Sequence, residues 1–397
     1  MIKVFITGMM PTATNNLGDD AVFFKFCSDL RQVFKKVKIT AAIRHLSKEY
    51  DEFFKIKSIK NLEYDSRSKS EGKFYFGFNK NDSPNYLNQI TDTIKKSDII
   101  FIGGSPFEGV SKENLLYDQA TYAVLIATIC KVLKKDYIIY GAKFFSIKNE
   151  DLRQKAKFVL ENAKEVYLRE KFSKKVILEN KIYPKKYFIT GDPVISKEIA
   201  NLNNKKNNSK ENLVGICFRY LYWSWDANTF NKRIVQVQAI LERLIEKYDY
   251  NIIMIPLQFY DKDTFKTNDL KVMNKLKASF KYKKKLLNFN KKINLSTVIN
   301  TISKCDFVIS NRRHICAFAS ITGVTPIGLI EKNNYENLYP MMNDLGLSNN
   351  LINMEKNSNN HKDNLDRIIN KRYNKNDLYK KCKKIFSRNS IFKKNLK

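Results

Sequence analysis

The stretch Cys305–Ile330, CDFVISNRRHICAFASITGVTPIGLI, decides the fold class and contains the strongest candidate site. Its apolar run Phe307–Ser310 predicts a buried strand, and the small-residue segment Arg313–Thr322 has the length and period of a helix. Another apolar run, Pro326–Ile330, predicts a second strand shortly after Gly323. A strand, a helix and a strand in this order are typical of a parallel sheet covered by helices.

The same alternation of strands and helices extends along most of the chain. Further strands are predicted at Lys3–Thr7, Val37–Ala42, Asp98–Ile102, Tyr137–Tyr140, Val166–Leu168, Tyr187–Thr190, Leu213–Phe218 and Asn251–Pro256. Helices are predicted between them, at Asp20–Phe34, Asn114–Leu133, Leu152–Asn162 and Thr229–Lys247. This alternation predicts an α/β protein whose parallel sheets have helices on both faces.

One segment separates the chain into two parts. Residues 201–210, NLNNKKNNSK, are rich in Asn and Lys and predict an exposed linker. We therefore expect two Rossmann-like domains, 1–200 and 211–345, with a cleft between them. Residues 346–397 are basic and partly amphipathic, and they predict a tail of helices.

The net charge of the chain is strongly positive, but it does not by itself identify a binding partner. The chain has 72 Lys and Arg residues and 40 Asp and Glu residues, a formal net charge of +32. Such a charge is typical of proteins that bind nucleic acid or an anionic membrane. Lys and Asn are abundant throughout the chain, however, which indicates a general bias and not one basic face. We therefore expect no nucleic-acid partner, and a weak attraction to an anionic membrane surface stays open.

The remaining composition indicates a cytoplasmic protein, and a place at the inner face of the membrane stays open. No apolar run approaches the roughly 20 residues that span a bilayer, and Met1–Thr7 lacks the features of a signal peptide. The six cysteines form no C-x-x-C pair and are expected to be buried, reduced thiols. The three histidines lie far apart in the sequence, so no dedicated metal site is expected.

Arg312, Arg313 and His314 form the strongest candidate site, because they stand where a predicted strand passes into a predicted helix. The N-terminus of a helix favours anions through its exposed amides and its dipole. Arginine adds forked recognition of phosphate or carboxylate, and histidine adds a proton that can move near neutral pH. The alternative is that these residues only cap the helix and carry surface charge.

Unusual residues also follow five other predicted strands, where open α/β sheets bind their ligands. The candidates are Asn16, Asp19, Asp20, Gly103, Gly104, Arg169, Asp192 and Arg219. Each has a simpler interpretation: the acidic pair can cap a helix, and the two glycines can make a tight turn. Arg169 can pair with Glu170, and Asp192 lies in an ordinary Gly-Asp-Pro turn.

In order and spacing, these segments resemble the polysaccharide pyruvyltransferase family. The similar elements are Asn16-Leu17-Gly18-Asp19-Asp20-Ala21, Ile102-Gly103-Gly104, Arg169-Glu170-Lys171-Phe172-Ser173, Asp192-Pro193, Val214-Gly215-Ile216 through Arg219, and Arg312-Arg313-His314 with Ala319 and Gly323-Val324-Thr325-Pro326. The chain departs from the family where Gly141-Ala142-Lys143-Phe144-Phe145 replaces Gly-x-Gly-Pro. The lysine that usually follows the last strand is not clearly placed, with Asn334 near its expected position.

The resemblance implies a fold similar to GT-B glycosyltransferases and transfer of pyruvate from phosphoenolpyruvate to a sugar of a cell-surface glycan precursor. The product would be a cyclic ketal, with phosphate released and no cofactor or metal required. His314 and Arg312 would be catalytic. Arg219 together with Arg312, or with Arg313 as the alternative to Arg312, would bind the donor on the C-terminal domain. The other candidates would serve the acceptor on the N-terminal domain. A GT-B-like glycosyltransferase using a nucleotide sugar and a non-catalytic glycan-binding relative are the alternatives.

Overall fold

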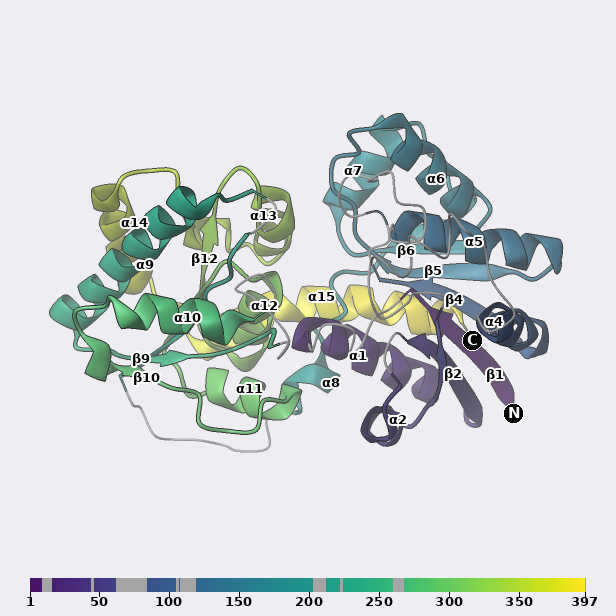
Figure 1. Cartoon of the computed structure of the whole chain (residues 1–397), viewed down its shortest axis with the longest axis horizontal. Helices are drawn as coiled ribbons and strands as arrows, with labels where there is room; N and C mark the ends of the chain where they lie inside the picture. The colour runs from purple at the N-terminus through teal and green to yellow at the C-terminus, as the bar shows by residue number, and fades with distance from the viewer. Residues whose placement is uncertain are drawn as a thin grey trace. The chain divides into compact units, whose positions relative to one another are not determined.

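In a computed structural model, the chain forms two α/β units. The structure describes residues 1–8, 16–43, 46–61, 84–104, 107, 119–202, 212–221, 224–259 and 268–396. Unit 1 contains Met1–Ala13, Val22–Pro193 and Arg388–Lys397, and unit 2 contains Thr14–Ala21 and Val194–Ser387. Each unit is built on one parallel sheet (Figure 1).

The sheet of unit 1 has seven strands in the order β3-β2-β1-β4-β5-β6-β7. The strands are β1 (Ile2–Thr7), β2 (Val37–Ile43), β3 (Lys57–Lys60), β4 (Ile99–Gly103), β5 (Tyr137–Ala142), β6 (Glu165–Leu168) and β7 (Tyr187–Ile189). The order reverses between β1 and β4, which makes this point the place where such a sheet opens to a ligand.

Helices cover both faces of this sheet. One face packs against α4 (Pro84–Lys96), α5 (Gln119–Val132), α6 (Glu150–Glu161) and α7 (Lys171–Glu179), through a core rich in Ile, Val and Ala. The other face packs against α1 (Leu17–Val33), whose Phe26 stacks on Tyr140 of β5. Phe23 of α1 in turn contacts α2 (Lys48–Phe54) through Phe54. Burial on both faces explains why the central strands are near-continuous apolar runs.

The sheet of unit 2 has six strands in the order β10-β9-β8-β11-β12-β13. The strands are β8 (Leu213–Cys217), β9 (Asn251–Met254), β10 (Leu286–Leu287), β11 (Phe307–Ser310), β12 (Thr325–Ile330) and β13 (Leu351–Asn353). Here the order reverses between β8 and β11. Both sheets therefore have one reversal point, as doubly wound folds do.

Helices again lie on both faces. A first set packs on the cluster formed by Val214, Ile252 and Ile309, and consists of α9 (Ala227–Tyr248), α10 (Asp269–Ala278) and α14 (Ser358–Asn370). The second set is α8 (Lys197–Ala200), α11 (Leu295–Ile302), α12 (Arg313–Thr322) and α13 (Tyr335–Asp344), which contact one another through α12. Two short 3-10 turns, Lys283–Lys285 and Ser348–Asn350, complete the unit.

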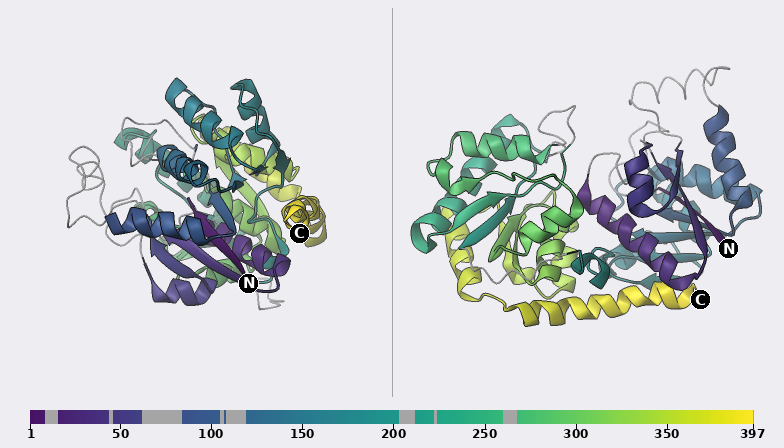
Figure 2. Two further views of the ribbon diagram at one scale, coloured as in Figure 1. Left: turned by 90° about the vertical axis from the view of Figure 1, so that its right-hand side faces the viewer. Right: turned by 90° about the horizontal axis from the view of Figure 1, so that it is seen from below.

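The long helix α15 (Lys375–Asn395) begins in unit 2 and contributes its last residues to unit 1 (Figure 2). In unit 1 its Phe392 is 1% exposed and contacts the rings of Phe26, Phe101, Tyr140 and Tyr167. The beginning and the end of the chain therefore both belong to unit 1.

The predicted fold class is confirmed, because both sheets are parallel and flanked by helices. The strand Phe307–Ser310 and the helix Arg313–Thr322 have the predicted bounds. The predicted linker lies mostly outside the described residues, and the units part at Pro193 and Val194. The predicted helical tail also contains β13, which pairs with β12.

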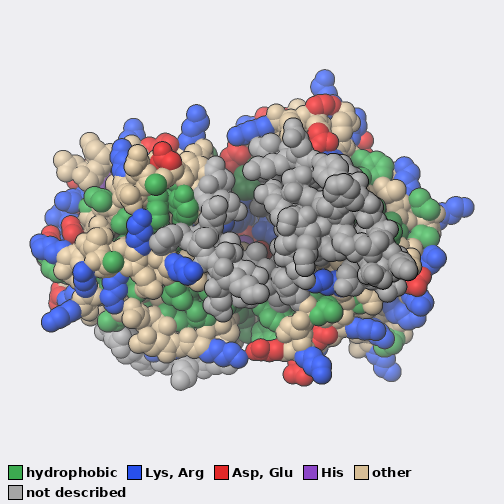
Figure 3. Space-filling model, viewed as in Figure 1, with side chains coloured by type: hydrophobic (Ala, Val, Ile, Leu, Met, Phe, Trp, Pro, Cys, Tyr) green, Lys and Arg blue, Asp and Glu red, His purple; other side chains and the backbone are tan. Residues whose placement is uncertain are grey.

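The structure also bears on the cysteines, on membrane-spanning helices, on metal ligands and on the distribution of basic side chains. All six cysteines are buried. No helix in the described ranges is long and apolar enough to cross a bilayer. The part of the chain that the structure describes contains no group of three His, Cys, Asp or Glu side chains that could hold a metal ion. Basic side chains are scattered over the face shown in Figure 3 and are not gathered in one patch.

Candidate functional site

The candidate site of unit 2 lies where β8 and β11 end, at the reversal point of its sheet. Ser310, the last residue of β11, donates a hydrogen bond to the carbonyl oxygen of Cys217 at 2.7 Å and accepts one from the amide of Arg312 at 2.9 Å. Arg312 is the N-cap residue of α12, and its side chain does not cap the helix. The first turn of α12 therefore presents its amides and the positive end of its dipole at this edge.

Arg312 is held by a buried ion pair with Asp269, the first residue of α10. Its guanidinium also donates to Oε1 of Gln258 at 3.0 Å, and only 5% of Arg312 is exposed. Both contacts use the same terminal nitrogen. Among the residues that the structure describes, none hydrogen-bonds the buried Nε of Arg312. The side chain is therefore fixed in place, with its Nε buried and not hydrogen-bonded within the described part of the chain.

Asp269 was not identified from the sequence, although it organises this part of unit 2. Its Oδ2 accepts hydrogen bonds from the amides of Leu257 at 3.1 Å and Gln258 at 2.8 Å. The Cys217 thiol lies 3.7 Å from the same oxygen, and burial, together with this carboxylate, raises the pKa of Cys217. A carboxylate with both oxygens occupied can balance the charge of Arg312 without being free to act on a ligand.

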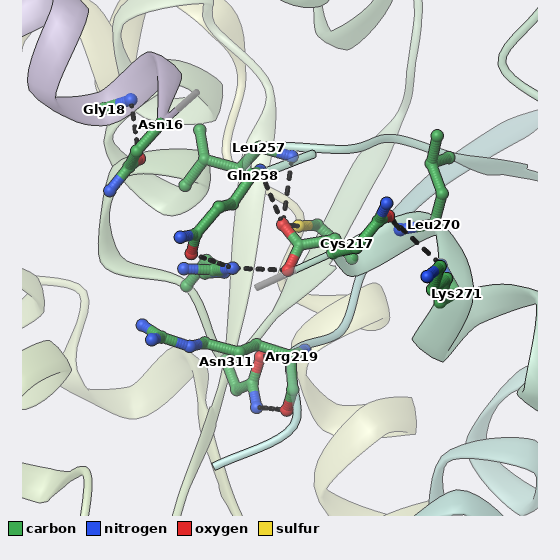
Figure 4. Close-up of polar contacts among 12 residues, drawn as sticks. Asn16, Gly18, Cys217, Arg219, Leu257, Gln258, Leu270, Lys271 and Asn311 are labelled. Carbon is green, nitrogen blue, oxygen red and sulfur yellow. Dashed lines mark hydrogen bonds and ion pairs between the residues drawn. The ribbon is translucent and has the colours of Figure 1, made fainter. Parts of the chain in front are cut away.

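Asn311 is the second residue without a role in the sequence analysis. Its Oδ1 accepts from the amide of Arg219 at 2.8 Å, and its Nδ2 donates to the carbonyl oxygen of Arg219 at 2.9 Å. These two bonds join the chain segments that follow β8 and β11, across the reversal point of the sheet (Figure 4). Arg219 is partly exposed, and its backbone position is fixed by this pair of bonds. The only sequence signal was an amide side chain next to two arginines.

Gly18 and His314 bring the N-terminal motif to the same edge. A Cβ atom built on Gly18 would overlap Nδ1 of the His314 ring, so the backbone of Gly18 lies directly against the imidazole. The amide of Leu17 also donates to the carbonyl oxygen of Leu257 at 3.0 Å, and Asn16 forms a β-bridge with Gln258. Only glycine allows this approach, which gives a physical reason for the glycine in the motif.

Asn16 directly precedes α1, and the two aspartates lie in the first turn of this helix. Oδ1 of Asn16 accepts from the amide of Gly18 at 3.1 Å, and its Nδ2 donates to Asp19 at 2.9 Å. Asp20 is 5% exposed. The first turn belongs to unit 2 although it lies early in the chain, whereas the predicted domain bounds assign it to the first domain.

Arg313 points to a different neighbour than Arg312 does. It is 4% exposed and donates to the carbonyl oxygen of Asn337, in α13, at 3.1 Å. Asn334, near the position of the family's lysine, is also buried and bonds the carbonyl oxygen of Leu329 at 3.1 Å. The two side chains anchor the segment around α13.

Gly103 and Gly104 lie at the reversal point of unit 1. Gly104 has φ +77°, in the left-handed region that favours glycine. Gly8, which follows β1, has φ +75°, and a Cβ atom there would lie 2.9 Å from the carbonyl oxygen of Gly103. The glycines thus let the ends of β1 and β4 approach closely.

Arg169 and Asp192 follow β6 and β7 in unit 1, and both are buried. Nε of Arg169 donates to the carbonyl oxygen of Gly141 at 2.6 Å, and the carbonyl oxygen of Asp192 accepts from Asn389 of α15 at 3.2 Å. Ser173 does not cap α7; its hydroxyl accepts from the amide of Phe144 at 3.0 Å.

The segment that departs from the family also has a clear structure. Lys143 is 1% exposed, and its ammonium lies 3.9 Å from the centre of the Phe145 ring. Phe144 stacks on Phe107 with 5.1 Å between ring centres. Bulky side chains therefore fill the end of β5, where the family has glycine and proline.

Apart from Arg313, which is bonded to the carbonyl oxygen of Asn337 in α13, the predicted site residues form two groups. Unit 2 brings together Asn16, Asp19, Asp20, Arg219, Arg312 and His314 with the newly found Gln258, Asp269 and Asn311. Unit 1 contains Gly103, Gly104, Arg169 and Asp192, at the carboxyl ends of its strands. The cleft predicted between the domains stays a prediction.

The two doubly wound units define a protein of the GT-B fold class. Solved structures with this fold include the UDP-GlcNAc 2-epimerase of Methanocaldococcus jannaschii (TM-score 0.63, 14% identity), which matches over 100% of this chain and 99% of that one. Anabaena Alr3699/HepE in complex with UDP-glucose has a TM-score of 0.62 at 10% identity, over 100% and 99% of the two chains. The S. aureus MnaA–UDP structure has a TM-score of 0.62 at 12% identity, over 100% and 98%.

The sequence assigns the chain more narrowly than the fold does. Residues 16–333 match the polysaccharide pyruvyl transferase family, and the chain therefore belongs to this family. No curated protein matches the chain in a direct sequence search. The matched range includes every predicted site residue of both units.

Proposed function

We propose that this protein transfers pyruvate from phosphoenolpyruvate to a sugar of a cell-surface polysaccharide or its precursor, forming a ketal and releasing phosphate. The observation that carries the proposal is the set of Arg219, Arg312 and His314 at the start of α12, within a chain of this family. Cations, helix amides and a titratable ring at one sheet edge suit a small substrate with two anionic groups.

The donor would bind through its two anionic groups. The amides of the first turn of α12 and the guanidinium charge of Arg312, whose Nε forms no hydrogen bond with the described residues, suit the phosphate. Arg219 would bind the carboxylate, because it is partly exposed and its backbone is fixed next to Arg312 by Asn311. Arg313 would have a supporting role, since it is buried against α13.

The chemistry requires two hydroxyl groups of one sugar. A proton is added to the methylene carbon, one sugar oxygen bonds to the adjacent carbon, and the phosphate then leaves from that carbon. The second hydroxyl bonds to the same carbon and closes the ketal. Of the two hydroxyl protons, one ends on the methyl group and the other on phosphate. His314 would move one of these protons as a general acid or base, and its contact with Gly18 would fix the ring.

The acceptor would be a sugar, held by carboxylates. Asp19 and Asp20 in unit 2, or Asp192 in unit 1, would orient or deprotonate its hydroxyls. Gly103, Gly104 and Arg169 would shape the acceptor side. We place the reaction in the cytoplasm, at the inner face of the membrane for a lipid-linked acceptor. We assign no cofactor and no nucleic-acid partner.

The test is phosphate release from phosphoenolpyruvate, measured with β-galactoside and N-acetylmannosamine acceptors. His314→Ala and Arg312→Ala should abolish release. Arg367→Ala is the matched control, because this exposed arginine bonds the carbonyl oxygen of Asn349 away from the site. Near-native turnover by both site variants, with correct folding by circular dichroism, would remove the assignment.

A nucleotide-sugar enzyme is the second candidate, because similar folds occur in structures with UDP or UDP-glucose bound. Thermal unfolding in the presence of each ligand distinguishes the two candidate functions. Phosphoenolpyruvate should raise the melting temperature of the native protein, and Arg219→Ala should remove this shift. A larger shift with UDP- or GDP-sugars, unaffected by Arg219→Ala, would favour the second candidate. A response to neutral glycans alone would indicate a non-catalytic glycan-binding relative.

A further inference from the structure

We propose that unit 1 has a second anion site, separate from the candidate site, that binds a ligand with several closely spaced negative groups. The site is a cavity of about 740 Å³ lined by β1, β2, β3 and α4. Its walls carry Lys3, Lys38, Lys57 and Lys96. The proposal does not depend on the pyruvyl transfer proposed above.

The strand register brings the lysines together. Lys3 of β1 pairs with Lys38 of β2, and Thr40 of β2 pairs with Lys57 of β3. Paired residues of neighbouring strands point to the same face, as do residues two apart in one strand. Three lysines from three adjacent strands therefore share one face of the sheet.

This face changes character along the strands. Toward their carboxyl ends it carries the apolar residues Phe5, Ala42 and Ile59, which belong to the core under α4. Toward their amino ends it carries the lysines: Lys3 and Lys38 are paired, and Lys57 is paired with Thr40, two residues after Lys38. A parallel sheet covered by a helix is normally apolar along its whole length. The lysines therefore mark a part of the face that α4 does not cover.

The cavity has an excess of positive charge. Four lysines line it against one acidic residue, Asp92. In the described ranges, no carboxylate forms an ion pair with Lys3, Lys38 or Lys57. Like charges directly opposite each other on neighbouring strands are destabilising. An anionic ligand would relieve this repulsion, and Asn88, Gln89 and Thr93 of α4 would add hydrogen bonds.

Two simpler explanations do not account for the cluster. Lysines protect edge strands from pairing with other chains, but this applies only to Lys57, because β1 and β2 are interior strands. A general surplus of lysine spreads charge over the surface, as Figure 3 shows for one face. Neither explanation predicts that lysines of three adjacent strands share one face beside a cavity.

The size of the cavity indicates the kind of ligand. Its volume lies within the roughly 300–1,000 Å³ typical of small-molecule sites. The spacing of the lysines suits neighbouring phosphates or carboxylates, which a diphosphate group or a run of acidic sugars would supply. The site lies at the amino ends of the strands, whereas Gly103 and Arg169 mark the carboxyl ends.

Titration calorimetry on the full-length protein tests the proposal, with pyrophosphate, trigalacturonate and neutral maltotriose as probes. The variant combines Lys3→Gln, Lys38→Gln and Lys57→Gln. The control makes the same charge change at three exposed lysines of unit 1 outside the cavity, Lys148→Gln, Lys175→Gln and Lys185→Gln. We expect at least tenfold weaker binding of one anionic probe to the cavity variant, and less than twofold weakening in the control.

The probes distinguish the two sources of negative charge. Loss of pyrophosphate binding alone would identify a phosphate ligand, and loss of trigalacturonate binding alone would identify an acidic glycan. Equal affinities in all three proteins, equal weakening in both variants, or no binding of either anion would overturn the proposal. Pyruvyl transfer to a small acceptor should be unchanged in the cavity variant, so the two proposals fail separately.

A second measurement needs no variant. The anionic probe should protect Lys3, Lys38 and Lys57 of the native protein from acetylation, as read by mass spectrometry. Lys148, Lys175 and Lys185 should be modified equally with and without the probe. If the probe left the acetylation of the cavity lysines as high as that of the three control lysines, the result would contradict the proposed anion site.

Discussion

The carboxyl edges of the two sheets are built in different ways. In unit 2, side chains hold the two arginines in place: Asp269 and Gln258 fix the side chain of Arg312, and Asn311 fixes the backbone of Arg219. In unit 1, glycines let backbones approach, and Arg169 uses its Nε on a carbonyl oxygen. The difference teaches that the arginines of unit 2 are held by side-chain partners, whereas Arg169 of unit 1 is bonded to the backbone of its own sheet.

The largest expected effect concerns the ion pair of unit 2. Asp269→Asn leaves the buried charge of Arg312 uncompensated, which should lower the free energy of unfolding by about 3–5 kcal/mol. Urea denaturation measures it. Glu150→Gln is the control from unit 1, because the Glu150 side chain is 63% exposed in its pair with Arg153. An equal loss in both variants would contradict the special role of the buried pair.

Glycine substitutions compare the two edges directly. Gly18→Ala would push the His314 ring aside, and we expect about a hundredfold lower kcat for pyruvyl transfer. Gly141→Ala in unit 1 meets its nearest atom at 3.6 Å, but its φ of +66° should cost about 1 kcal/mol of stability. Steady-state kinetics and thermal unfolding of both variants separate these effects. Normal turnover by Gly18→Ala would exclude His314 from the reaction.

The two hydrogen bonds between the Asn311 amide and the Arg219 backbone should affect donor binding more than stability. Asn311→Ala removes both bonds to the Arg219 backbone, and we expect about a tenfold higher KM for phosphoenolpyruvate, equivalent to about 1.4 kcal/mol. Asn350→Ala is the matched control, since this buried amide bonds the carbonyl oxygen of Pro326 at 3.1 Å. The control should lower the melting temperature without changing KM. A higher KM in both variants would mean that general loosening of unit 2 is responsible.

The smallest expected effect is a pH dependence. Partial burial tends to raise the pKa of Asp366, but hydrogen bonds from Arg243, Lys247 and Tyr248 outweigh it and hold this pKa well below its ordinary value. The resulting stability is present above about pH 4, the unfolded pKa, and is lost as the pH falls toward the folded pKa. The melting temperature should therefore fall less steeply between pH 4 and pH 2 in Asp366→Asn than in the native protein.

Unit 1 provides the comparison for this pH dependence. The bond from Arg153 lowers the pKa of the exposed Glu150 to about 2. Because solvent screens this pair, Glu150→Gln should change the same pH profile less than Asp366→Asn does. A larger change for Glu150→Gln would show that solvent exposure does not decide how much an ion pair contributes to stability.

The sequence predicted those parts of the fold whose signal is local. Phe307–Ser310 is a continuous apolar run, and the small residues of Arg313–Thr322 fit a buried helix, so both bounds were correct. The helix α11 and the strand β13 were not predicted. The first follows a lysine-rich segment, and the second has only three residues and owes its pairing to β12.

The candidate site was predicted only in part, for the same reason. Arg312 and His314 stand out because they are adjacent and charged at a strand end. Asp269 lies 43 positions from Arg312 in the sequence and there reads as an ordinary first residue of a helix. Only the packing of β9 beside β8 brings it to the guanidinium. The role of Asn311 likewise cannot be predicted from the sequence, because it depends on which backbone segment the side chain bonds.

The place of Phe392 has a consequence for how the chain is made. Unit 1 is interrupted after Pro193 and resumes at Arg388. Until that later segment leaves the ribosome, Phe26, Phe101, Tyr140 and Tyr167 lack the ring that packs among them. The unit whose strands are synthesised first must therefore wait for the last residues of α15 before its core is complete.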